Sequence, residues 1–382
     1  MSLTVLMVVN GLGTGGAERS LAESLPHLVA GGIRPVIACL YRRQEGVEEQ
    51  VRAQGFPVHI LEGRRLPSRT VALRRLLAEV RPDLIHTTIF EADLVGRLAA
   101  MGRLPVLTSL VNTSYVPQRL ADPNISPWKL RVTRLVEGWT ARHLTFHFHA
   151  ISEAVKAAAV ESLGIQLERI TVVPRGRDPE RLGRPDPKRR RRMRGRLGVG
   201  DGEVVVNVGR QEYQKGQRHV IEAVGLLAPH RPGLVLLVAG RGGHASGELE
   251  RLAEQAPEGL VRFLGHREDV AEVLAAADLF AFPSLYEGLG GAVIEAMALG
   301  LPIVASDLPS LREVVEEGGN ALLVPPGSPV ALAGAIAELL DDRARARAFG
   351  ARSREIFEAR FTLAESVPAM ISLYRRVVAG AG

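Results

Sequence analysis

The feature that most constrains the fold of this chain is a repeated order of segments: an apolar run, a glycine-rich turn and a helical pattern. Residues 3–9 form such a run, the turn NGLGTGG follows at residues 10–16, and apolar side chains then recur at helical spacing. The same order starts again at residues 204–208, which lead into the turn GRQEYQKG. Strands that alternate with helices in this way build a parallel sheet with helices on both faces. The predicted fold class is therefore α/β, with two parallel-sheet domains in tandem.

The boundary between these domains is predicted near residues 174–187, where prolines cluster before a basic run. That run, PDPKRRRRMRGR at residues 185–196, is interpreted as a solvated linker or helix face. The last helical pattern has no strand after it and is expected to pack elsewhere. We therefore predict a first domain at residues 1–178, a second at 179–362 and a C-terminal helix at 363–382.

The composition limits the classes of function that the chain can have. Its 382 residues are enough for two cores, and a single cysteine, Cys39, excludes a disulfide framework and a cysteine zinc site. The net charge of +6 favours anionic partners, but no aromatic residues are interleaved with the basic run at residues 185–196, so nucleic acid is not expected. No apolar run reaches the roughly 18 residues needed to cross a bilayer. We expect a cytoplasmic protein, with peripheral contact at the inner face of an anionic membrane as an open alternative.

One helical pattern, residues 127–143, is both amphipathic and basic. Its apolar residues include Trp128, Leu135 and Trp139, which stand among lysine and arginine. Packing on its own domain is favoured over resting on an anionic membrane. No metal site is predicted, because three nearby histidines lack an acidic or cysteine partner close in sequence; they are His143, His147 and His149.

The stretch FPSLYEGLGGAVIEAMAL at residues 282–299 has the order expected of a site that grips a phosphate. A short strand ends at a proline, glycines let the backbone approach a ligand, and a helix then begins with amides that lack an intrahelical partner. Such a terminus attracts phosphate. Glu287 and Glu295 are interpreted as acceptors for hydroxyl groups on either side of that phosphate. The alternative is that both are ordinary solvated residues near a helix start.

The loop after the first strand of the second domain carries two cations, Arg210 and Lys215. In an open parallel sheet, ligands bind beyond the carboxyl ends of the strands, so this loop and the Glu287 loop are expected to face one cavity. A lysine and an arginine there would neutralise a diphosphate and stabilise it as it leaves. Two surface cations in an arginine-rich chain are the alternative.

A different enzyme class is suggested by the first glycine turn. Gly11, Gly13 and Gly16 match the dinucleotide fingerprint G-x-G-x-x-G after a strand. Arg42 follows the second strand, where an arginine suits the extra phosphate of NADP. This NADP-dependent oxidoreductase hypothesis explains nothing in the second half of the chain.

Five motifs make the chain resemble the retaining family-four glycosyltransferases over essentially its whole length. They are GTGGAER at residues 13–19, VGRQEYQKG at 208–216, FLGHREDV at 263–270, PSLYEGLGGAVIEAMALGLPIVAS at 283–306 and LREVVEEGGNALLVPPGSP at 311–329. The resemblance implies two Rossmann-like domains that face each other across a cleft, the GT-B architecture. It also implies that the first domain is on the acceptor side, that the second binds the nucleotide sugar, and that the C-terminal helix crosses back to the first domain.

The resemblance further implies a reaction and a set of residues. A hexose-type sugar would pass from a UDP- or GDP-linked donor to a hydroxyl of a cell-envelope glycan or lipid-linked acceptor. Its anomeric configuration would be kept, and no metal or other cofactor would be needed. Arg210, Lys215 and Glu287 would be catalytic. The donor would be bound by Gly15, Gly16, Gly209, Arg210, Lys215, Arg267, Glu287, Gly288, Leu289, Gly290, Gly291 and Glu295.

The chain departs from the family pattern at one position of the first domain. Many relatives carry a histidine after the strand spelled VLTSL, whereas this chain has Val111. Ser109 and Asn112 are candidates to replace its contacts on the acceptor side. Besides the oxidoreductase, the alternatives are a sugar-nucleotide epimerase of the same architecture and a non-catalytic glycan- or membrane-binding module.

Overall fold

The computed structural model describes residues 2–381, and the chain divides into two compact units. The first unit comprises Met1–Val116, Ser126–Arg177 and Leu363–Gly382, and the second comprises Pro117–Ile125 and Asp178–Thr362. The division differs from the predicted boundaries at Pro117–Ile125. That segment groups with the second unit, where the charges of Arg119 and Asp122 act on the Tyr286 phenol. Local periodicity carries no sign of such a contact, because it depends on residues far away in the sequence.

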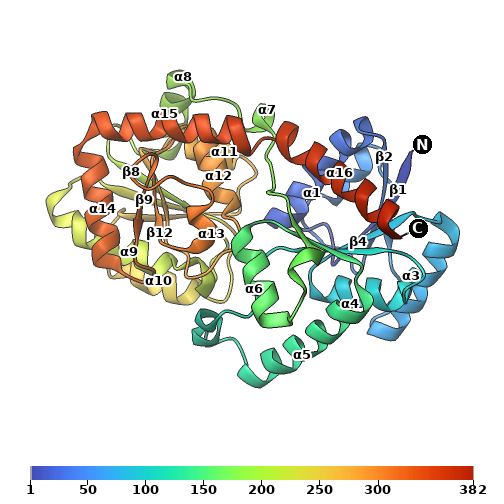
Figure 1. Ribbon diagram of the computed structural model, residues 1–382. Coiled ribbons are helices and arrows are strands. Elements are labelled where there is room, and N and C mark those ends of the chain that lie inside the picture. The colour runs from blue at the N-terminus through green and yellow to red at the C-terminus, as the bar shows by residue number, and fades with distance from the viewer. Residues whose placement is uncertain (1, 382) are drawn as a thin grey trace. The chain divides into compact units, whose positions relative to one another are not determined.

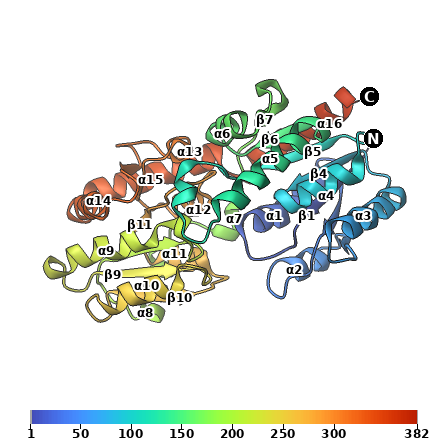
Figure 2. The same cartoon turned by 90° about the horizontal axis from the view of Figure 1, so that it is seen from below.

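Within residues 2–381, the first unit is built on a seven-stranded parallel sheet with the order β3-β2-β1-β4-β5-β6-β7 (Figures 1 and 2). Its strands are β1 (Leu3–Val9), β2 (Ile33–Cys39), β3 (Val58–Ile60), β4 (Leu84–Thr88), β5 (Val106–Leu110), β6 (His147–Ala150) and β7 (Ile170–Val172). Its α-helices are α1 (Gly16–Ala30), α2 (Glu48–Ala53), α3 (Leu66–Val80), α4 (Phe90–Ala100), α5 (Pro127–Leu144), α6 (Glu153–Leu163) and α16 (Leu363–Ala381).

The core of the first unit lies on both faces of this sheet, because successive side chains of a strand point to opposite faces. Val5 and Met7 of β1 pack with apolar residues of α1 and α16. Leu6 and Val8 of the same strand pack with residues of α3 and α4. The continuous apolar run at the start of the chain is thus a strand that is buried on both sides.

Within the same described range, the second unit has a six-stranded parallel sheet with the order β10-β9-β8-β11-β12-β13. Its strands are β8 (Val204–Val208), β9 (Val235–Ala239), β10 (Val261–Gly265), β11 (Leu279–Phe282), β12 (Ile303–Ser306) and β13 (Ala321–Val324). Its α-helices are α7 (Pro179–Leu182), α8 (Pro187–Leu197), α9 (Gln217–Leu227), α10 (Ser246–Glu254), α11 (Val270–Ala275), α12 (Gly291–Ala298), α13 (Pro309–Arg312), α14 (Pro329–Asp341) and α15 (Arg343–Arg360). Together, the two parallel-sheet units confirm the predicted α/β class.

Helix α15 has no counterpart among the predicted elements. Its sequence RARARAFGARSREIFEAR is mostly charged, so an apolar stripe is hard to recognise. Three apolar residues, Phe349, Ile356 and Phe357, recur at helical spacing and are buried. Phe349 joins the apolar cluster of the second unit, so a few large side chains hold this helix in place.

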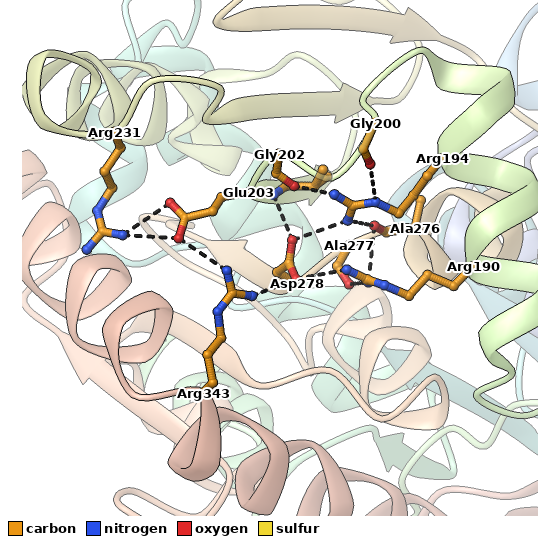
Figure 3. A network of polar contacts seen from close by, with 11 residues as sticks. Arg190, Arg194, Gly200, Gly202, Glu203, Arg231, Ala276, Ala277, Asp278 and Arg343 are labelled. Carbon is orange, nitrogen blue, oxygen red and sulfur yellow. Dashed lines mark hydrogen bonds and ion pairs between the residues drawn. The ribbon is translucent and has the colours of Figure 1, made fainter.

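The basic run is helix α8, and it is more than a solvated face. Arg190 and Arg194 turn toward Asp278 at the start of β11, with nitrogen–oxygen distances of 2.8 and 3.3 Å (Figure 3). Arg343 of α15 reaches the same carboxylate at 3.1 Å. The interpretation of this run as solvated is therefore wrong for these two arginines, because a largely buried carboxylate from a distant segment pairs with them.

None of the helices within residues 2–381 combines the length and the apolar content that crossing a bilayer requires.

Candidate functional site

The sheet order of the second unit brings together the two loops that carry the predicted site residues. Strands β8 and β11 are neighbours and pair in parallel, Leu279 opposite Val205 and Phe280 opposite Val206. The carboxyl ends of parallel neighbours lie at the same edge of the sheet, so the loops after these strands are adjacent there. Sequence periodicity does not reveal this neighbourhood, because β8 and β11 are not consecutive along the chain.

Lys215 and Glu287 form an ion pair between these loops. Lys215 Nζ donates a hydrogen bond of 2.6 Å to Glu287 Oε2, and the side chains are 20% and 12% exposed. The same ammonium group lies 5.3 Å from the centre of the Phe282 ring, within cation–π range. The predicted proximity of these two groups is present, and a ligand that approaches the edge meets a lysine already held in position.

Backbone contacts fix the two loops against each other. The amide of Leu285 donates to the carbonyl of Gln214, and the Gln214 side chain donates to the carbonyl of Tyr286. Gly216 has a φ of +59°, and a Cβ added there would lie 2.1 Å from the carbonyl oxygen of Pro283. Only glycine allows this close approach of one loop to the other.

Helix α12 begins directly behind the Glu287 loop. Gly290 precedes it with a φ of +81°, and, among the described residues, no side chain caps its first turn. Gly288 donates its amide to Glu287 Oε1 at 3.2 Å, which orients the carboxylate. Leu289, 5% exposed, packs inward, so the backbone of the turn rather than this side chain remains for a ligand. The uncapped helix start is suited to an anion.

Glu295 lies in the second turn of α12 and is 6% exposed. Arg181 of α7 approaches its carboxylate at 3.6 Å. Each of the two predicted carboxylates therefore has a cation beside it. Arg181 was not recognised in the sequence, although the sequence offers one signal, since a glutamate inside an otherwise apolar helix requires a partner.

Two of the predicted cations are placed differently from Lys215. The Arg210 side chain is exposed, and within residues 2–381 it makes no ion pair or side-chain hydrogen bond. Arg267 follows β10, at the edge of the sheet, and donates two hydrogen bonds of 2.7 Å to Asp269. Its guanidinium is thus occupied by Asp269. The carbonyl of Gly209 accepts from Gln217 at 3.1 Å.

Two buried oxygens on these loops lack hydrogen-bond partners within the described residues. They are Oγ of Ser284, which is 0% exposed, and Oε1 of Gln217, which is 1% exposed. Buried polar atoms are usually satisfied, so unsatisfied ones beside a candidate site are candidates for ligand or water contacts. Sequence reasoning missed both residues, although Ser284 lies in the loop that it singled out.

The candidate residues of the first unit lie at or beyond the carboxyl ends of strands β1 and β5. Gly15 precedes α1 and Gly16 is its first residue, just beyond β1. Gly16 is exposed, and a Cβ added there would meet nothing within 4 Å. Asn112 accepts a hydrogen bond from the amide of Thr113, so its oxygen stabilises a local turn.

Ser109 lies in a buried chain of hydrogen bonds. Its hydroxyl is 2.7 Å from Nε2 of His86 and 2.8 Å from Nδ1 of His149. His86 Nδ1 contacts the Tyr374 hydroxyl, and His149 Nε2 contacts the carbonyl oxygen of Val173. Burial lowers the pKa of His86 to about 3 and that of His149 to about 4, so both rings are neutral at pH 7.

Because both rings are neutral, the donor and the acceptor of each hydrogen bond in this series can be assigned. The Val173 carbonyl can only accept, so His149 carries its proton on Nε2 and accepts from Ser109 through Nδ1. Ser109 then accepts from His86, which accepts from Tyr374. The Ser109 hydroxyl is fully engaged, and this argues against Ser109 as a sugar contact. The sequence does not reveal this, because Tyr374 lies 288 positions from His86.

The same four side chains line part of a cavity of about 100 Å³ within the first unit. Its remaining walls come from polar and apolar residues of β1, α1 and α16 and from the segments at the ends of β4 and β7. Ligand pockets usually exceed about 300 Å³, so this cavity is too small for a hexose with its aglycone. Within residues 2–381, no group of three or more histidine, cysteine, aspartate or glutamate side chains is arranged to hold a metal ion.

Comparison with known proteins places both units in one enzyme group. A family model described as "Glycosyltransferase Family 4" matches residues 14–181, and one described as "Glycosyl transferases group 1" matches residues 202–342. The chain is 28% identical over 302 residues to 2-deoxystreptamine glucosyltransferase of Streptomyces kanamyceticus, covering 76% of this chain and 78% of that protein.

Two further likenesses extend over nearly the whole chain. A GDP-mannose-dependent alpha-(1-6)-phosphatidylinositol monomannoside mannosyltransferase of Mycobacterium tuberculosis is 29% identical over 374 residues, 92% of each chain. The crystal structure of Anabaena HepE in complex with UDP and glucose has a TM-score of 0.86 and 24% identity, covering 98% of this chain and 100% of that one. The second likeness concerns the fold, which is that of two parallel-sheet domains.

Proposed function

The chain is a glycosyltransferase of the family-four, group 1 type with the GT-B fold, and from this premise we propose that it transfers a hexose-type sugar with retention of anomeric configuration. The donor is a nucleoside diphosphate sugar linked to UDP or GDP. The observation that carries this proposal is the Lys215–Glu287 pair beside the uncapped start of α12. A cation, a carboxylate and a helix start without a side-chain cap at one sheet edge match the charges of a diphosphate and the hydroxyls of its sugar.

Each residue of the pair has a distinct part in the proposed reaction. Lys215 and Arg210 neutralise the diphosphate as the bond from the anomeric carbon to the phosphate oxygen breaks and its electron pair leaves with the phosphate. The acceptor oxygen forms the new bond on the same face, and its proton passes to the departing phosphate. Glu287 accepts hydrogen bonds from the sugar, and Glu295 accepts them from the ribose. Gly15 and Gly16 contact the donor or acceptor from the first unit, where Asn112 remains an acceptor-side candidate.

The acceptor is proposed to be a cell-envelope glycan or a lipid-linked sugar. Support comes from the mycobacterial relative, whose name gives a phosphatidylinositol mannoside as its acceptor. We place the enzyme in the cytoplasm, in peripheral contact with the inner face of the membrane. Each nucleotide has its own support. The Anabaena structure is a complex with UDP, and the name of the mycobacterial relative specifies GDP-mannose.

Nucleotide-dependent thermal stabilisation tests the donor site. A ligand that binds the folded state raises the melting temperature, and at a concentration of 100 Kd it adds about 2.7 kcal/mol to the free energy of unfolding. UDP or GDP is expected to raise the melting temperature and NADPH to leave it unchanged. Glu295→Ala should remove the nucleotide-induced shift. Lys215→Met should raise the Kd for the nucleotide at least about tenfold and so make the shift smaller. Glu79→Ala, an exposed carboxylate of α3, is the control that keeps the shift.

The shift is measured relative to each variant without ligand, so a general loss of stability is not mistaken for a loss of binding. Stabilisation by NADPH alone would overturn the proposal. Transfer is then assayed with a panel of UDP- and GDP-sugars, and the anomeric configuration of the product is read by NMR. An inverted product would refute retention while leaving the donor site in place.

A further inference from the structure

Helix α5 carries a stripe of exposed apolar side chains. Five apolar side chains are between 42% and 66% exposed; they are Trp128, Val132, Leu135, Val136 and Trp139. Their spacing of four, three, one and three residues keeps them within about 100° of the helix circumference. Helix α5 packs on its own domain as expected, but these five side chains are not buried there.

The opposite face of α5 explains why this stripe points outward. Glu137, Thr140 and Ala141 are buried, and α5 packs there against α4 and α6 (Figures 1 and 2). Glu137 accepts a hydrogen bond from Tyr115, and the Thr140 hydroxyl accepts one of 3.0 Å from the buried Arg97. These polar contacts fix the rotation of the helix, so the apolar stripe cannot turn inward without breaking them.

Basic side chains border the stripe on both sides. Lys129 lies at one border and Arg131 at the other, with Arg134 beyond it, and all three are exposed. The Lys129 ammonium group lies 5.8 Å from the Trp128 ring, along the apolar surface. The one acidic residue in the sequence of α5 is Glu137, which faces inward. An apolar centre with basic borders is the pattern of a helix that lies in the plane of a membrane interface.

We propose that this face of α5 docks on an anionic lipid surface, with the two tryptophans at the headgroup level. The residues from Trp128 to Trp139 span about 16 Å at 1.5 Å per residue, and tryptophan prefers the membrane interface. A second copy of the chain fits this surface less well. Two copies packed through this face would bring Arg131 and Arg134 against the same cations without carboxylates to oppose them.

This inference rests on the part of the proposed function that places the acceptor at a membrane. The test uses neither donor nor acceptor, so its failure is distinct from failure of glycosyl transfer. The chain contains two tryptophans, and both lie in the stripe. Their fluorescence in the full-length protein therefore reports directly on docking when vesicles of phosphatidylcholine with phosphatidylglycerol are added.

The tryptophan emission is expected to move to shorter wavelength with anionic vesicles and to stay unchanged with pure phosphatidylcholine vesicles. Raising the salt concentration should weaken binding, because the Debye length falls to about 3 Å at 1 M ionic strength. Val132→Ser combined with Leu135→Ser should lower the vesicle partition coefficient at least about tenfold while keeping both tryptophans as reporters. The matched control is Leu66→Ser with Val71→Ser, a leucine and a valine of α3 that are 39% and 46% exposed.

Three results would overturn the proposal. The first is equal binding by the stripe variant and its control. The second is an emission shift that follows protein concentration in the absence of vesicles, which would indicate self-association through the stripe. The third is emission that is already at short wavelength and protected from acrylamide in the free protein, which would mean that another part of the chain covers the stripe.

Discussion

Gly216 is the residue on which the geometry of the donor loops depends most directly. Its φ of +59° lies in the left-handed region, and its α-carbon faces the Pro283 carbonyl at a distance that excludes a side chain. Nine positions on, Gly225 lies inside α9 with nothing within 4 Å of an added Cβ. A side chain would therefore clash at Gly216, whereas Gly225 has room for one.

We expect Gly216→Ala to lower the free energy of unfolding by more than the about 1–2 kcal/mol that left-handed backbone costs a residue with a Cβ. The added methyl group also pushes the Lys215 loop away from Pro283, so the nucleotide-induced thermal shift should weaken. Gly225→Ala is the control, and it should raise the free energy of unfolding by up to about 1 kcal/mol through helix propensity. Equal effects of the two substitutions in denaturant unfolding would contradict this view of the loop.

At the scale of elements, Asp278 joins two helices and a neighbouring strand. Its carboxylate is 12% exposed, accepts the amide of Val204 at 2.9 Å and contacts arginines of α8 and α15. Arg343 also reaches Glu203, which pairs in turn with Arg231 of the second unit (Figure 3). The network attaches the basic helix α8 to the sheet mainly through charged side chains, with Met193 as its buried apolar residue.

Asp278→Asn is predicted to lower the free energy of unfolding by about 3 kcal/mol, because it leaves half-buried arginines without a counter-charge. Glu316→Gln is the control. It removes a carboxylate that pairs with Arg352 at 2.7 Å, but both side chains are 44% exposed, so its cost should stay below about 1 kcal/mol. Urea unfolding of both variants measures the difference, and a cost for Asp278→Asn no larger than that of the control would rule out a structural role for the network.

At the scale of the whole molecule, the hydrogen-bond chain of His86, Ser109 and His149 links stability to pH. In the folded state, burial lowers the pKa of His86 from 6.5 to about 3 and that of His149 from 6.5 to about 4, because it disfavours the charged form of each ring. Between pH 4 and 6.5 the unfolded chain therefore binds more protons than the folded one. The stabilisation is present above pH 6.5 and is lost as the pH falls toward 4.

The melting temperature should accordingly fall between pH 6.5 and 4, with a loss on the order of a few kcal/mol at the acid end. His149→Gln is expected to flatten this dependence while lowering stability at pH 7, since Ser109 loses its acceptor. His27→Gln, which changes an exposed histidine of α1, should leave the slope as it is. A slope that is identical in all three proteins would show that these buried rings do not control it.

Much of the fold could be predicted from local pattern. Apolar runs and glycine turns located the strands, and a proline-rich stretch marked the region near Arg177 where the chain enters the second unit. The proximity of Lys215 to Glu287 followed from the rule that ligand loops gather at the carboxyl edge of a parallel sheet. Helix α15 escaped prediction because charged residues dominate its sequence, and Arg181 did because its partner lies more than a hundred positions away.

The sequence by itself determined which segments are strands and helices, since backbone preferences and the period of apolar residues act over a few neighbouring positions. Only the tertiary structure decided what each face meets. It made β8 and β11 neighbours, turned Arg190 and Arg194 onto Asp278, engaged the Ser109 hydroxyl and left the stripe of α5 in solvent. An apolar period indicates that a face is suited to burial, but the surface that buries it comes from distant parts of the chain or from another molecule or membrane.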